Sequence, residues 1–203
     1  MMAATLLLTV GTSLATGPEK ESKTYEIDTK SSKITWLGKK VTGEHTGHLM
    51  LSKGTVTAAG TQVQSTEVTM NMSSITCTDL EDEGYNQKLV GHLKSEDFFS
   101  VEKFPTGSFE AEKFVPIANA KKGEANYTVK GKLTLKGITH ELSFPAFVEV
   151  KDGKLIANGK ATFDRAKYNI KYGSGSFFEG LGDKMIYDDV DLTFELVAIA
   201  TAG

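Results

Sequence analysis

The sequence is poor in residues that form covalent cross-links or concentrate charge. It has one cysteine, Cys77, among 203 residues, so no disulfide can form within the chain, and we expect this thiol to fill a small space in the core. The net charge is −3 and the lysines are scattered, which gives no surface for a polyanion such as nucleic acid. The single arginine, Arg165, is distinguished by its rarity alone.

Long hydrophobic runs are also missing, since no stretch reaches the roughly 20 apolar residues that span a bilayer. We therefore expect no integral membrane protein. The N-terminus carries a shorter apolar run followed by the small-x-small pattern of residues 13–15. This pattern predicts a signal peptide over residues 1–16 and an exported protein; the alternatives are a first strand or a flexible tail. Residues 17–23 are interpreted as a polar linker before a single domain over 24–199.

Alternating apolar and polar residues recur from Tyr25 to the C-terminus. The last run places Val190, Leu192, Phe194 and Leu196 on one face of an extended chain. About eight such runs, separated by glycine-containing turns, predict an all-β sandwich or barrel. Residues 84–94 instead have helical spacing, residues 96–99 continue it, and Phe104-Pro105 ends it. This segment predicts a short helical excursion that crosses or caps one end of the barrel.

The clearest hairpin covers residues 127–146, with a two-residue turn at Lys136-Gly137. The turn fixes the register of both strands. It predicts four pairs on one apolar face: Leu135–Ile138, Leu133–His140, Gly131–Leu142 and Val129–Phe144. This face is either filled core or the wall of a pocket.

The side chains expected inside the barrel differ in size. The candidate lining residues are Trp36, Phe109, Leu133, His140, Leu142, Phe144, Phe163 and Phe194. The small inward residues are Gly38, Gly47, Gly131 and Ala161. A fully packed core would more often hold larger aliphatic residues there, which favours a tunnel, although glycine also relieves strain where barrel strands bend.

Several patterns give no support for a metal ion, a cofactor or a catalytic group. The acidic stretch from Asp79 resembles the start of a calcium loop, but Val90 stands where the bidentate glutamate should be. His45 and His48 lie three apart, so a strand points them to opposite faces. Residues 173–176 lack the lysine and the helix of a phosphate-binding loop. We predict no metal site, no cofactor and no catalytic residues.

Four segments together resemble the YceI-like family of lipid-binding proteins. They are residues 25–47 (with Ser32-Lys33-Ile34-Thr35-Trp36 and Gly43-Glu44-His45-Thr46-Gly47), residues 91–109 (Gly91-His92-Leu93-Lys94 to Phe109), residues 131–140 and residues 163–170 (Phe163-Asp164-Arg165). The resemblance implies an antiparallel eight-stranded, lipocalin-like barrel with an apolar channel. It further implies binding of a long isoprenoid lipid, a polyprenyl phosphate or a quinone, by a bacterial protein that is periplasmic or extracellular.

Two pairs depart from the pattern of the family. Lys39-Lys40 stands in place of a histidine after the first strand, and Leu89-Val90 in place of an Arg-Asp pair before the His-Leu. In other members of the family, the residues at these two places are polar groups near the channel.

For an anionic head group the candidates are Arg165 and His92, with Lys94 behind them. Each has a structural alternative: a salt bridge at a strand end for Arg165, and a helix-terminal hydrogen bond for His92. For His140 a satisfied core histidine is favoured over a ligand contact.

Two other functions remain open at this point. An enzyme acting on an amphipathic small molecule would need a convergent acid–base pair inside the channel, and a stress-response interaction module would have a packed core. Lysine-rich sheet faces argue against broad apolar interfaces, so we expect a monomer or a homodimer.

Overall fold

The computed structural model describes residues 20–201. The predicted signal peptide lies outside the described residues. Nine antiparallel strands account for most of the fold: β1 (Ser22–Ile27), β2 (Lys33–Lys40), β3 (Gly43–Ala59), β4 (Gln62–Asn71), β5 (Thr106–Pro116), β6 (Tyr127–Leu135), β7 (Ile138–Lys151), β8 (Lys154–Asp164) and β9 (Ile186–Ala200). β1 begins at Ser22, inside the segment predicted as a linker.

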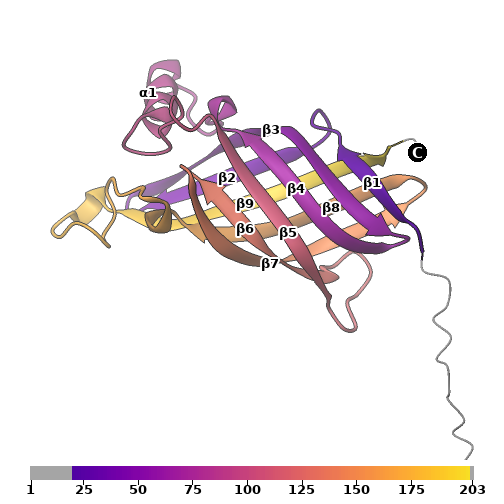
Figure 1. Ribbon diagram of the computed structural model, residues 1–203. Coiled ribbons are helices and arrows are strands. Elements are labelled where there is room, and N and C mark those ends of the chain that lie inside the picture. Colours follow the sequence, from indigo (N-terminus) through magenta and orange to yellow (C-terminus); the bar gives the residue numbers. More distant parts are fainter. Residues whose placement is uncertain (1–19, 202–203) are drawn as a thin grey trace, which may run out of the picture.

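The strands form one closed sheet, in which the order runs β1-β3-β2-β9-β8-β7-β6-β5-β4 and β4 returns to β3 (Figure 1). β1 and β2 lie end to end between the same two neighbours: β9 pairs with β2 over its first part and with β1 over its last residues. The two short strands therefore occupy one strand position of the barrel between them. This gives the eight-stranded antiparallel barrel that the sequence predicted, in which every strand of residues 20–201 has a paired neighbour on both sides over at least part of its length.

The predicted hairpin is confirmed pair by pair. Leu135 lies opposite Ile138, Leu133 opposite His140 and Gly131 opposite Leu142. Both turn residues have positive φ, 51° at Lys136 and 71° at Gly137. This backbone matches the right-handed twist of the flanking strands, which is why a two-residue turn sets the register so reliably.

The predicted helix is confirmed as α1 (Glu83–Lys94), but residues 96–99, which were expected to continue it, form a turn. The Asp82 side chain accepts a hydrogen bond from the Tyr85 amide at 2.9 Å and caps its first turn. α1 and the loop that connects β8 to β9 lie at one end of the barrel, opposite the end at which β1 begins and β9 ends (Figure 1). In the described part of the chain, no helix is both long enough and apolar enough to cross a membrane.

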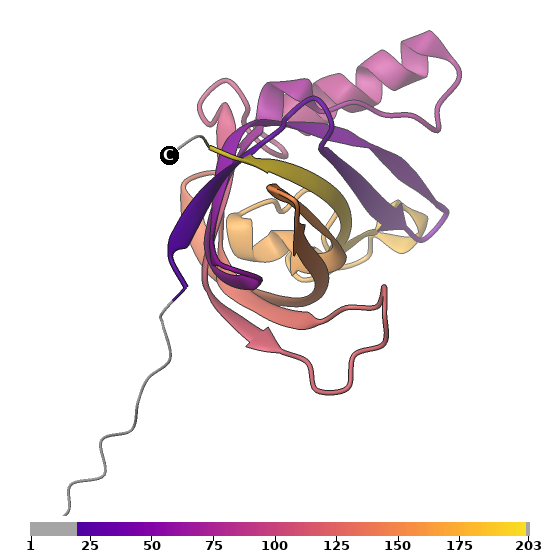
Figure 2. The same ribbon diagram turned by 90° about the vertical axis from the view of Figure 1, so that its right-hand side faces the viewer.

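Three short 3₁₀ turns complete the structure: η1 (Met72–Ser74), η2 (Arg165–Tyr168) and η3 (Gly182–Lys184). The view along the barrel axis shows η2 lying across the far opening (Figure 2). Tyr168 and Ile170 from this region are fully enclosed, so the chain itself forms a floor at the α1 end.

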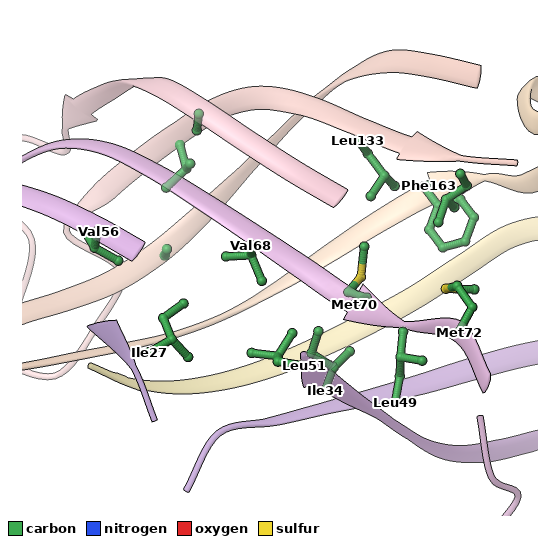
Figure 3. Close-up of a cluster of buried hydrophobic side chains, with 14 of the residues drawn as sticks. Ile27, Ile34, Leu49, Leu51, Val56, Val68, Met70, Met72, Leu133 and Phe163 are labelled. Atoms are coloured by element: carbon green, nitrogen blue, oxygen red, sulfur yellow. The ribbon is translucent and has the colours of Figure 1, made fainter. Parts of the chain in front are cut away.

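The core is the inside of the barrel, where apolar side chains from the strands point toward one another (Figure 3). Two of the small inward positions do not leave the room that the sequence suggested. A methyl group at Gly131 would meet the Phe109 ring at 2.7 Å, and one at Gly47 would overlap the Thr76 carbonyl. Gly38 does leave space, because its nearest neighbour would be the Trp36 ring at 3.9 Å.

Candidate ligand-binding site

The larger interior cavity, about 140 Å³, lies at the α1 end of the barrel. Its walls come from strand ends on several sides, which bring Gly38, Met70, Leu135, Phe163 and Val190 together. Leu89 and Leu93 of α1, one helical turn apart, cover it together with Phe98 and Phe99. The cavity therefore lies between the barrel wall and the helix.

A second cavity of about 50 Å³ lies nearer the opposite end. It is lined by inward residues of that end, among them Ile27, Val56, Val148, Leu155 and Ala198. Along β9 the change from one cavity to the other is clear, since Leu192 lines the larger and Phe194, two residues on, lines the smaller.

Buried side chains separate the two cavities: Ile34, Leu51 and Val68, which line neither of them, and an aromatic layer (Figure 3). The layer consists of Phe109, Phe144 and Phe194, whose rings meet in sequence, with centroids 5.3 Å apart for the first pair and 5.4 Å for the second. Tilted and edge-to-face contacts of this kind are favourable. The interior is thus two compartments in this conformation and not one continuous channel.

The predicted lining residues are distributed over these compartments. Trp36, Leu133 and Phe163 line the larger cavity, Phe144 and Phe194 line the smaller one, and Phe109 belongs to the layer between them. His140 and Leu142 line neither. The His140 Nε2 lies 3.0 Å from the Lys167 carbonyl oxygen and the ring packs against Tyr168, which is the arrangement of a satisfied structural histidine.

Arg165 lies against the larger cavity, but its donors are directed into the chain. Nη1 donates to the carbonyls of Ile170 and Tyr172, at 3.1 and 2.9 Å. Nε and Nη2 donate to the carbonyls of Tyr187 and Ile186, both at 3.1 Å. The side chain is 3% exposed. This geometry matches the structural alternative for Arg165 and leaves little capacity for a ligand head group.

The charge partner of Arg165 is Asp188, whose Oδ1 lies 3.2 Å from Nη2. Within the described residues this buried oxygen has no hydrogen bond of good geometry, so the arginine charge is its compensation. The other oxygen, Oδ2, accepts from Ser174 and Ser176. Burial lowers the pKa of Arg165, and Asp188 opposes that effect.

The other two head-group candidates lie outside the cavity lining. His92 Nε2 is 3.0 Å from an Asp97 carboxylate oxygen, and its ring packs edge-on against Phe98 and Tyr172. Lys94 is the last residue of α1. Neither side chain is among the residues that line the larger cavity.

Besides Arg165, the cationic side chains that line the larger cavity are Lys39 and Lys40, at the end of β2. Lys39 Nζ is 3.1 Å from Asp191 Oδ2, and both side chains are partly exposed. In the sequence this lysine pair is recognisable only as a departure from the family pattern. Its place at the end of a strand that faces the channel was the signal that could have identified it.

Comparison with known protein families matches residues 25–198 to the YceI-like domain. The chain belongs to the YceI-like family. The match covers nearly all of the described barrel and confirms the resemblance seen in the sequence. No curated protein matches the chain.

Solved structures share the fold of this YceI-like protein. BcnA of Burkholderia cenocepacia has 24% identity and a TM-score of 0.62, over 84% of this chain and 98% of BcnA. A domain from Saccharophagus degradans, described as polyisoprenoid-binding and implicated in plant cell wall breakdown, has 16% identity and a TM-score of 0.63, over 87% and 98%. A Campylobacter jejuni YceI protein has 16% identity and a TM-score of 0.51, over 100% and 94%. At these identities the likeness concerns the fold.

Proposed function

We propose that this protein binds an isoprenoid lipid, a polyprenyl phosphate or a quinone, and carries or sequesters it without chemical change. The observation that carries the proposal is the apolar cavity at the α1 end, lined by strand ends and by Leu89 and Leu93. Membership of the YceI-like family and the polyisoprenoid-binding description of one structural neighbour support the same ligand class.

The size of the cavity limits what can enter without rearrangement. A closed apolar cavity of roughly 150 Å³ accommodates a benzene-sized group. The larger cavity, about 140 Å³, therefore has space for about one isoprene unit. Burial of that five-carbon unit contributes roughly 3–4 kcal/mol before the entropy losses of binding. A longer tail requires the rings of Phe144 and Phe194 to rotate out of the layer.

The polar end of such a ligand would lie near the lysine pair. Lys39 and Lys40 are the lysines in the lining of the cavity, and the Lys39 ammonium is held near Asp191, which lies on the face of β9 opposite Val190 and Leu192. A lysine is a mobile point charge that suits an anionic head group without a fixed geometry. An exported location remains a prediction that rests on the N-terminal sequence.

The enzyme alternative finds little support around the larger cavity. Among the described residues that line it there is no aspartate or glutamate. His45, the histidine in that lining, has its Nδ1 2.8 Å from Asp79 Oδ2. The nearby Cys77 donates to Asp79, and burial raises the pKa of its thiol, which is the opposite of an activated nucleophile.

The test is ligand recovery followed by uptake. The protein is expressed in a lipid-rich host and extracted with organic solvent, and the extract is examined by mass spectrometry; delipidated protein is then offered geranyl, farnesyl and longer prenyl phosphates and a quinone. We expect a bound isoprenoid lipid or uptake of at least one probe. No lipid in the extract together with no uptake would contradict the proposal.

A matched pair of variants locates the binding site. Gly38→Leu fills the open space beside Trp36 and should abolish uptake, because a methyl group at Gly38 has room and a longer side chain enters the cavity. Thr35→Val on the same strand faces outward toward His48 and should bind as the wild type does. Equal uptake by both variants would place the ligand elsewhere.

A further inference from the structure

Three side chains that commonly bind metal ions converge at the rim of the barrel. His45 Nδ1, Cys77 Sγ and a carboxylate oxygen of Asp79 all lie within 4.8 Å of one another. His45 belongs to β3, whereas Cys77 and Asp79 follow η1. His45 is more than 30 positions away from Cys77 and Asp79 in the sequence, so the fold brings the histidine to the other two residues.

The backbone explains why they meet. Residues 75–79 run along the edge of β3 that β4 does not cover: the amides of Thr76 and Thr78 donate to the carbonyls of His48 and Thr46, at 3.0 and 2.9 Å. In an extended chain, side chains two positions apart point to the same side. Cys77 and Asp79 therefore present their ligand atoms together, toward His45.

The distances are close to those of a bound ion. His45 Nδ1 lies 2.8 Å from Asp79 Oδ2, and Cys77 Sγ lies 3.2 Å from Asp79 Oδ1. Ligands arranged tetrahedrally around zinc at its usual bond lengths are about 3.4–3.6 Å apart. Small side-chain movements would thus open a site. The Thr46 amide, 2.8 Å from Asp79 Oδ1, holds the carboxylate from behind, as outer-shell partners of metal ligands do.

We propose that His45, Cys77 and Asp79 form a binding site for zinc or a similar divalent transition-metal ion. The nitrogen, sulfur and oxygen donors suit zinc, whereas calcium and magnesium prefer oxygen alone. Three protein ligands leave one coordination position for water or another small ligand, in contrast to closed four-ligand structural sites. His45 also lines the larger cavity, so the ion lies at its rim.

Cobalt is the probe for this site. Metal-free protein is titrated with Co²⁺, and the absorption spectrum is followed for the thiolate-to-cobalt charge-transfer band and for the visible bands of tetrahedral cobalt. Competition between zinc and a chromophoric chelator then gives stoichiometry and affinity. We expect one ion per chain and a sulfur charge-transfer band.

Variants assign the ligands. His45→Gln and Asp79→Asn should each weaken zinc binding by at least the roughly 10–100-fold seen when an outer-shell partner is lost. Cys77→Ala should abolish the charge-transfer band, and alanine fits a buried position with little effect on the fold. His48→Gln is the matched control, because His48 lies on the same strand but faces Thr35; it should bind zinc as the wild type does.

Three results would overturn the proposal: a cobalt spectrum without sulfur character, undiminished zinc affinity in Cys77→Ala, or the same loss in His48→Gln as in His45→Gln. The last would mean that zinc binds to surface histidines in general. Circular dichroism of each variant shows whether it is folded. If Asp79→Asn is misfolded, the zinc affinity of Cys77→Ala and the thermal stabilisation of the wild type by zinc show whether the site binds the ion.

This cluster was not predicted from the sequence, in which His48 is the histidine nearest to His45 and was the only partner considered for it. The sequence feature that points to the site is the Cys-x-Asp spacing at 77–79. Two residues at this spacing in an extended segment point to the same side and can supply two of the metal ligands. Their histidine partner could not be identified without knowing which strand the segment follows.

Discussion

The rings of Phe144 and Phe194 meet edge to face with centroids 5.4 Å apart, and this contact is the central part of the layer between the two cavities. Phe109 extends the layer on the other side of Phe144. Because side chains and not the backbone divide the barrel, the usable length of the interior depends on the rotamers of these rings and of aliphatic neighbours such as Leu51.

Removing a ring of this layer should join the two compartments. For Phe144→Ala we expect delipidated protein to accept longer prenyl chains than the wild type does, measured by native mass spectrometry with a series of prenyl phosphates. The free energy of unfolding should fall by at most about 3–5 kcal/mol, the range for fully buried Phe→Ala changes, since Phe144 is only partly buried.

Phe114→Ala is the control for this experiment. Phe114 lines only the smaller cavity and packs against Tyr127, with ring centroids 6.2 Å apart. Its loss should destabilise the barrel without changing the longest chain accepted. If Phe144→Ala keeps the wild-type length limit, the layer does not control the interior.

Arg165 should be a stability residue. Arg165→Lys keeps the positive charge but cannot reproduce the fork that serves four carbonyl oxygens and Asp188. Breaking a buried charged network of this kind costs about 3–5 kcal/mol. Urea unfolding should show a loss of that order.

Lys39→Ala is the comparison for Arg165→Lys. It removes an ion pair whose side chains are 44% and 42% exposed, and such pairs contribute about 0–1 kcal/mol. A loss in Arg165→Lys no larger than the loss in Lys39→Ala would show that the buried network is dispensable.

The scarcity of arginine in the sequence singles out Arg165, but it does not show that Arg165 has a structural role. The sequence offered a head-group contact and a structural salt bridge as alternatives. The hydrogen-bond partners that decide between these roles include the backbone carbonyls of Tyr187 and Ile186, more than 20 positions away. Every residue has a backbone carbonyl, so the sequence does not show which of them accept a hydrogen bond from Arg165. Long-range polar networks of this kind are invisible until the topology is known.

Tyr168 should make the protein sensitive to alkali. Burial, followed by the nearby charge of Asp164, raises the pKa of Tyr168 to about 12, whereas a tyrosine in the unfolded chain ionises near pH 10, about the usual value. Its contribution to stability is therefore complete below about pH 10 and is lost as the pH rises toward 12.

The measurement compares urea unfolding of wild type and Tyr168→Phe at pH 8, 10 and 11. The wild type should lose stability more steeply above pH 10, because the phenylalanine variant lacks the group that titrates. The variant also loses the hydroxyl contact to the Leu133 carbonyl, 3.4 Å long, which is a constant offset at every pH. Parallel curves would show that Tyr168 ionises normally.

Two glycines should respond in opposite directions to alanine. Gly137 has a φ of 71° in the hairpin turn, so Gly137→Ala should destabilise by about 1–2 kcal/mol. Gly91 lies in α1 with open space around it, so Gly91→Ala should stabilise by about 0.5–1 kcal/mol. Thermal unfolding of both variants gives the comparison; a gain at Gly137 or a loss at Gly91 would contradict the backbone assignment.

The sequence predicted the fold where the pattern was local. The register of the 127–146 hairpin and the presence of α1 follow from turn chemistry and periodicity over a few residues, and both are confirmed, although α1 ends at Lys94 and does not continue through Phe99. The packing of the interior was harder to predict from the sequence. Gly131 was expected to leave an open space, but the Phe109 ring from the neighbouring strand occupies that space. Which side chain fills a space is decided by partners across the sheet.

Closure of the barrel depends on residues from opposite ends of the chain. The Thr201 hydroxyl donates to the carbonyl of Thr24, across 177 positions, and β9 supplies the neighbour for both β1 and β2. The entropy of closing so long a loop must be lost before these contacts form. The barrel therefore cannot close until its last strand is available, and a chain shortened before β9 should expose strand edges and aggregate instead of forming a smaller barrel.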